Sequence, residues 1–168
     1  MHSIYILSVW LHIVAATIWV GGMLFLVLVV VPWLRSGGQQ HAGLFLRETA
    51  TRFRSIAWWC FGVVLVTGTF NLWMRGVRLG NFVDPDWLAS PFGSTVAAKL
   101  AVFAVVLAIS ARHDYVVGPR ASAEIARDPR SAESDRLRRA ASLHGRVNTL
   151  LALLLLAIGV MIVRGRPW

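Results

Sequence analysis

Cysteine and lysine are almost absent from this chain. Cys60 is its only cysteine and Lys99 its only lysine, so the remaining basic residues are all arginines. A lone cysteine excludes a disulfide framework within the chain and a metal cluster held by thiolates. The first apolar run also lacks a positively charged segment ahead of it and a small-x-small cleavage pattern after it. We therefore expect a true membrane span there, not a cleaved signal peptide.

Long apolar runs are what the chain has in abundance. Hydrophobic residues make up 57% of its 168 residues, whereas a soluble domain is about half apolar. A helix of roughly 20 apolar residues crosses a bilayer, and uninterrupted runs of this length fit helices rather than barrel strands. The sequence therefore predicts an all-α polytopic membrane protein, a four-transmembrane-helix bundle forming one domain over residues 1–168. The four predicted spans are residues 4–31, 55–74, 94–111 and 143–163.

The formal net charge of +9 would suit a nucleic-acid-binding protein, but its distribution does not. The positive-inside rule assigns arginine-rich loops to the cytoplasm, so we predict cytoplasmic loops 1 and 3 and both termini outside. The expected partners are membrane lipids rather than nucleic acid, and the expected location is a bacterial-type inner (plasma) membrane. The arginines of loops 1 and 3 are Arg35, Arg47, Arg52, Arg54, Arg112, Arg120, Arg127, Arg130, Arg136, Arg138, Arg139 and Arg146.

The segments between the spans have patterns of their own. Loop 1 predicts a short amphipathic helix with Leu44, Phe45 and Phe53 as its apolar positions. Loop 3 is polar and mixed in charge, which predicts a solvated hairpin with a fraying helical end.

Each predicted span has one stripe of polar or small residues at helical spacing. Polar side chains in a bilayer turn inward and find partners, and small residues let helices approach closely. We therefore expect the four stripes to face the interior of the bundle. They are His12, Ala15, Ala16, Trp19 and Gly22; Cys60, Val64, Thr67 and Asn71; Lys99, Phe103, Val106, Ser110 and His113; and His144, Asn148, Leu151, Leu155 and Gly159.

Depth along the spans divides the polar residues into two groups, because a helix rises 1.5 Å per residue. The outer group is His12, Lys99 and Asn71, and the inner group is His113, His144 and Asn148. We interpret these groups as sites for one or two haem b molecules. His12, Lys99, His113 and His144 are the candidate metal ligands, and Arg112 and Arg146 are candidate partners for the haem propionates.

Haem at two depths would give an electron path across the membrane. The function predicted from the residues is thus electron transfer by a haem b protein, linked to a quinol and a redox partner protein. If the chain is an enzyme, we expect a membrane oxidoreductase that uses haem b; no catalytic residue is assigned.

Copper is the alternative ligand, since imidazole accepts it. The N-terminal amine with His2 could chelate Cu(II), but the methionines form no M-x-x-M pair for a Cu(I) relay. Purely structural roles also stay open. His113 and His144 could be wetted interfacial histidines, His12 could form an interhelical hydrogen bond with Asn71 or Thr67, and Lys99 could extend toward lipid phosphate.

Three motifs in order resemble a known family. They are H-x(6)-W-x-G-G in "LHIVAATIWVGGMLFL", T-G-x-x-N in "RFRSIAWWCFGVVLVTGTFNLW" and G-x(5)-K-L in "SPFGSTVAAKLAVFAVVLAIS". Together the three stretches resemble the copper resistance protein D (CopD) membrane domain, which implies copper import or resistance. The histidine of the first motif and the lysine of the third are also similar to those of HemJ-type haem-binding protoporphyrinogen oxidases. This similarity implies haem b held by His12 and Lys99. It also implies a third possible function, that of an enzyme of the protoporphyrinogen oxidase type.

Overall fold

Helices account for nearly all of the computed structural model. It describes the backbone of residues 1–35, 39–128 and 130–165, and the side chains of these residues except 34–35, 39–47 and 50. Within this described part, no strand occurs and four helices are long and apolar enough to cross a membrane. The predicted all-α fold with four spans is therefore confirmed, whereas the side on which the termini lie stays a prediction. The four helices are His2–Trp33, Thr51–Met74, Pro91–Arg127 and Ala132–Arg164.

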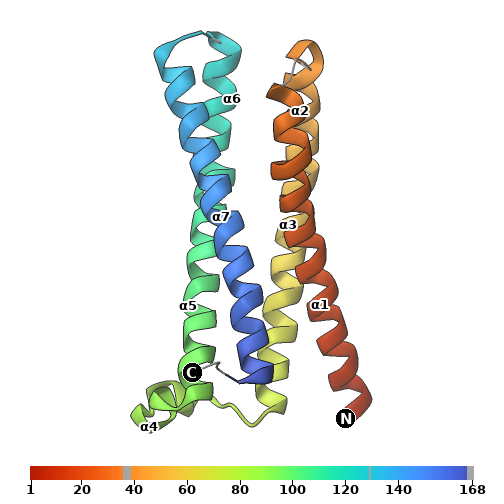
Figure 1. Ribbon diagram of the computed structural model, residues 1–168, viewed down its shortest axis with the longest axis vertical. Helices are drawn as coiled ribbons and strands as arrows, with labels where there is room; N and C mark the ends of the chain where they lie inside the picture. The colour runs from red at the N-terminus through yellow and green to blue at the C-terminus, as the bar shows by residue number, and fades with distance from the viewer. Residues whose placement is uncertain (36–38, 129, 166–168) are drawn as a thin grey trace. The chain divides into compact units, whose positions relative to one another are not determined.

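The chain divides into two compact units, and the first comprises Met1–Gly80. Helix α1 (His2–Phe25) continues through the π-helical turn η1 (Leu26–Val30) into α2 (Val31–Arg35), and α3 (Gln39–Met74) lies alongside it (Figure 1). Buried aromatic rings tie α1 to α3, with the rings of Trp19 and Phe61 4.9 Å apart edge to face. Ala15 and Ala57 are buried between these helices, where small side chains permit close approach.

The second unit comprises Asn81–Trp168. A 3-10 turn, η2 (Leu79–Val83), leads into α4 (Pro85–Ala89), α5 (Pro91–Arg112), the π-helical turn η3 (His113–Val117), α6 (Gly118–Arg127) and α7 (Ala132–Arg164). Helices α5 and α7 lie side by side along their length (Figure 1). Their contact is apolar at its centre, where the fully buried Val106 and Ala152 lie with Leu155 and Ile158.

The start of α5 is fixed by its capping residues. Pro91 occupies the first turn, where its missing N–H costs nothing. The Ser90 hydroxyl accepts a hydrogen bond from the Gly93 N–H at 3.0 Å and donates one to the Trp87 carbonyl at 2.6 Å. This arrangement folds α4 back onto the first turn of α5, with the Trp87 ring edge to face with that of Phe92.

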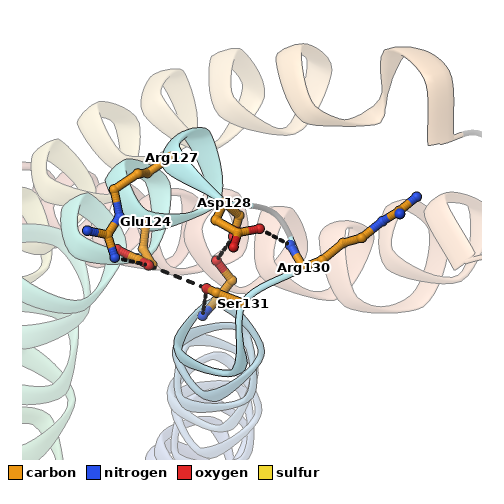
Figure 2. Close-up of polar contacts among 6 residues, drawn as sticks. Glu124, Arg127, Asp128, Arg130 and Ser131 are labelled. Carbon is orange, nitrogen blue, oxygen red and sulfur yellow. Dashed lines mark hydrogen bonds and ion pairs between the residues drawn. The ribbon is translucent and has the colours of Figure 1, made fainter.

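Helices α6 and α7 occupy most of the segment in which a solvated hairpin was predicted, and polar contacts join their ends. The Ser131 hydroxyl caps α7 by accepting from the Ser134 N–H at 3.0 Å, and the Ser134 hydroxyl donates to the Asp128 carbonyl at 2.6 Å (Figure 2). Glu124 accepts from Ser131 and pairs with Arg127 at 2.8 Å. These polar contacts join the end of α6, at Arg127, to the start of α7, at Ala132.

Helices in both units extend past the predicted spans. The uninterrupted helix Pro91–Arg127 has 37 residues, or about 55 Å at 1.5 Å per residue, whereas the apolar core of a bilayer is ~30 Å thick. Its end and the α6–α7 turn therefore lie beyond that core. Likewise the helix predicted in loop 1 exists but is continuous with the second span, since α3 begins at Gln39. The side chains of Leu44 and Phe45 lie outside the described residues.

Candidate functional site

The polar stripes face the packed side of each unit. Every stripe residue predicted from the sequence is buried or half-buried. Many of the exposed residues are apolar ones that lie between the stripe positions, such as Ile13 on α1, Leu65 on α3, Val105 on α5 and Leu154 on α7. The rotation of each helix within its unit is therefore the one that hides polar groups from lipid.

The inner group of the second unit brings two histidines together. His113 is the first residue of η3 and His144 lies on α7, and their ring centres are 6.2 Å apart with the planes tilted by 33°. With a metal–nitrogen bond of ~2.0 Å on each side, two imidazoles in line with one ion have ring centres ~6 Å apart. The spacing of this inner pair, as we call His113 and His144, is therefore compatible with two ligands of one metal ion.

The protonation of the inner pair follows from its hydrogen bonds. His144 Nδ1 lies 2.8 Å from the Ala140 carbonyl oxygen, which can only accept, so Nδ1 holds the proton and Nε2 has the lone pair. This backbone bond is the usual support of a metal-binding histidine. His113 Nδ1 is buried and has no hydrogen-bond partner among the described residues. A buried nitrogen without a partner is costly in a structure without ligands, and a bound cation would remove that cost.

A direct polar link joins the same two helices one turn away. The Asn148 side-chain amide donates to the Ser110 hydroxyl at 3.0 Å, and Ser110 is buried. Ser110 precedes His113 by three residues, which is ~4.5 Å along a helix. A porphyrin ring reaches farther than this from its iron, so the link occupies space that a haem between His113 and His144 would need. The inner pair fits a bare ion better than a haem.

The outer group is divided between the two units. In the first, His12 on α1 lies 2.9 Å through Nδ1 from the Thr67 hydroxyl on α3, and that hydroxyl donates to the Val63 carbonyl at 2.6 Å. The hydroxyl proton is thus committed, so His12 Nδ1 is the donor and Nε2 has the lone pair. The alternative of an interhelical bond from His12 to Thr67 is confirmed. Asn71 is half-buried on α3, and its Oδ1 has no partner among the described residues.

Lys99 lies in the second unit, half-buried on α5. Its Nζ faces α7, where a Cβ on Gly159 would lie 3.3 Å away, so the glycine makes room for the amine. The predicted convergence of Lys99 with His12 and Asn71 would join the two units and stays a prediction. Arg112 and Arg146, the predicted propionate partners, are exposed.

Two features of the site were missed in the sequence. The Ala140 carbonyl that orients His144 is a backbone group with no sequence signal of its own. The Ser110–Asn148 bond did have a signal, because each residue lies one turn from a histidine on the same stripe. The described residues contain no group of three or more histidine, cysteine, aspartate or glutamate side chains that could hold a metal ion, so the inner pair is a two-histidine arrangement.

Replacing Thr67 with valine should weaken the packing of α1 on α3. The change keeps the volume but removes the hydroxyl that accepts from His12, and we expect a loss of about 1–2 kcal/mol in unfolding free energy. Thr69→Val is the matched control, because the exposed Thr69 hydroxyl bonds only to the Leu65 carbonyl of its own helix. The unfolding free energies of both variants are measured in mixed micelles. Equal losses in the two variants would contradict the assigned role of Thr67.

Comparisons with known proteins agree with the family resemblance of the sequence, and the family model includes the second and third motifs. The family model described as copper resistance protein D matches residues 47–162, a segment that includes the inner pair. An uncharacterized protein of Aquifex aeolicus (strain VF5) is 35% identical over 159 residues, which cover 95% of each chain. No solved structure matches the chain. Since the family model covers more than half of its length, the chain belongs to the copper resistance protein D family.

Proposed function

We propose that this membrane protein handles copper, and that the inner pair binds the copper ion as cargo at one end of the bundle. The observation that carries the proposal is the 6.2 Å separation of the His113 and His144 rings, which suits one ion between two imidazoles. Family membership supports copper as that ion.

The position of the pair suggests which side of the membrane the ion reaches. His113 follows the last residue of α5, and His144 lies near the start of the fourth predicted span, so the two histidines lie at the two ends of the arginine-rich loop 3. Under the positive-inside rule that loop is cytoplasmic. The inner pair would then receive or release copper on the cytoplasmic side of a bacterial-type inner membrane.

The test is the copper content of the detergent-purified full chain. The protein is incubated with copper salt, once with ascorbate and once without, and is then desalted. In at least one of the two preparations, the unaltered protein should retain one copper ion per chain that is bound by the pair. His113→Ala and His144→Ala should each lose that ion, because one imidazole does not hold it. Thr149→Val is the control, because the buried Thr149 hydroxyl bonds only to the Gly145 carbonyl of its own helix. Full copper retention by both histidine variants of the pair would overturn the proposal.

Haem b with electron transfer is the second candidate function, and one observation favours it at His12. The Thr67 hydroxyl lies 2.9 Å from Nδ1 of His12 and orients its imidazole, which is the kind of support that a ligand histidine of haem iron has. Haem would supply reversible one-electron chemistry, while the chain's own part would be to hold and orient it. Lys99 as a second ligand, a quinol, a redox partner and protoporphyrinogen oxidation all remain predictions.

An absorption spectrum of the purified chain separates the two candidates. Haem would give a Soret band and α and β bands that sharpen on reduction, and His12→Ala should abolish them. A colourless protein that binds copper at the inner pair would reject the haem candidate.

A further inference from the structure

The ligands at the inner pair point to one oxidation state of copper. Both are imidazoles, on η3 and α7 of the same unit. The second unit contains no cysteine, and its one methionine, Met161, lies 17 residues beyond His144, or about 25 Å along the helix. Among histidine, cysteine and methionine, two imidazole nitrogens are therefore the side-chain ligands that the unit places together, and the Asp114 carboxylate adjoins His113 in sequence.

Metal ions differ in how many ligands they need. Cu(II) favours a square-planar or tetragonal set of nitrogen and oxygen ligands, and zinc is almost always four-coordinate. Cu(I), with a filled d shell, is stable between two nitrogens in line. A two-imidazole site thus discriminates for Cu(I) through ligand number rather than through ligand softness.

The Ser110–Asn148 hydrogen bond gives the pair its spacing. It joins α5 to α7 at 3.0 Å, one turn from each histidine, and Ser110 is buried. Polar bonds between helices in a membrane stabilise helix association, so this bond favours one separation of the two helices. A fixed separation matters here because a two-ligand site has no third ligand to compensate when one imidazole moves away.

We propose that the inner pair is a two-coordinate Cu(I) site, with Ser110 and Asn148 as positioning residues that hold the two imidazoles at the spacing for one ion. The proposal deepens the copper function above and rests on it. It identifies the cargo as cuprous copper, which must be supplied by a reducing compartment or by a donor that already holds Cu(I).

Two titrations of the detergent-purified full chain test the oxidation state. Cu(I), kept reduced by ascorbate without oxygen, is titrated against a chromophoric Cu(I) chelator; Cu(II) is titrated without reductant and followed by electron paramagnetic resonance. We expect one Cu(I) per chain that is lost in His113→Ala and His144→Ala. Any Cu(II) signal should persist in those variants and disappear in His2→Ala, where the N-terminal amine loses its partner.

The outcomes separate this inference from the function on which it rests. Cu(II) bound at the pair, with its signal lost in His113→Ala and His144→Ala, would overturn the Cu(I) assignment and leave copper handling intact. Failure of the pair to bind copper in either state would overturn both.

The positioning role has its own test. Ser110→Ala should weaken Cu(I) binding by about tenfold or more, the usual effect of losing a residue that supports metal ligands, and Ser110→Thr, which keeps a hydroxyl, should restore it. X-ray absorption should show two nitrogen ligands in the unaltered protein and a changed ligand shell in Ser110→Ala. The control is Thr149→Val, because the buried Thr149 hydroxyl bonds only to the Gly145 carbonyl of its own helix. Unchanged Cu(I) affinity and ligand shell in Ser110→Ala would overturn the role.

Discussion

Gly93→Ala is expected to cost the second unit about 3 kcal/mol of unfolding free energy, at the upper end of the usual range for overpacking. A Cβ at this position would overlap the carbonyl oxygen of Trp87 and crowd the Trp87 ring. The obstacle is backbone, which a rotamer change does not relieve. To admit the methyl group, α4 must move off α5 and break the hydrogen bonds of the Ser90 cap.

The measurement is thermal or detergent-induced unfolding followed by tryptophan fluorescence, since Trp87 reports on the affected contact. Gly62→Ala is the matched control: Gly62 is exposed on α3 and a Cβ there meets no atom within 4 Å. Because alanine favours helices over glycine by about 1 kcal/mol, the control should be neutral or slightly stabilised. Equal stability of the two variants would contradict the close packing of α4 on α5.

The fold was predictable because a bilayer imposes simple rules. Apolar length sets the number of spans, and the high cost of lipid-exposed polar groups sets the rotation of each helix. The second rule applies to single residues, so His12 and Ser110 could be assigned to packed faces from their spacing alone. The one interhelical bond proposed from the sequence, from His12 to Asn71 or Thr67, forms with Thr67.

Helix length was not predictable from the same rules. Hydropathy detects where a segment stops being apolar, but a helix continues as long as its backbone is bonded and one face is packed. Beyond the third predicted span, Val117 and Ala121 are buried in the second unit together with Ser134 of α7. This narrow packed face keeps α6 helical through residues that are otherwise polar. Because hydropathy is averaged over a window of residues, the few buried positions do not raise the average enough to be detected.

The candidate site was predictable as a set of residues, but its ligand was not. Spacing placed His113, His144, Ser110 and Asn148 on facing stripes, which suits an ion and a haem equally well. The choice depends on how far apart two helices stand at one level, and a periodic pattern does not give that distance. The Asn148–Ser110 bond, which joins the two helices near the pair, is a tertiary contact. Family membership points to copper, and it does so through similarity to other proteins rather than through the spacing of residues in this chain.

Gly22→Leu should destabilise the first unit by about 2–3 kcal/mol, again through overpacking. Gly22 on α1 is half-buried, and a Cβ there would overlap Cε2 of the Phe53 ring on α3. The close approach at the end of the H-x(6)-W-x-G-G motif therefore depends on the second of its two glycines. Gly21→Leu is the matched control one residue earlier, because Gly21 is exposed and a Cβ there meets no atom within 4 Å.

The obstacle at Gly22 is a side chain, so removing that side chain should rescue the variant. In a Phe53→Ala background, the added leucine has the space of the lost ring, and its cost should fall by about 1–2 kcal/mol, a coupling typical of residues in contact. The four proteins of this double-mutant cycle are compared by their unfolding free energies in mixed micelles. A cost for Gly22→Leu that is the same with and without the Phe53 ring would mean that the glycine is required for some contact other than this one.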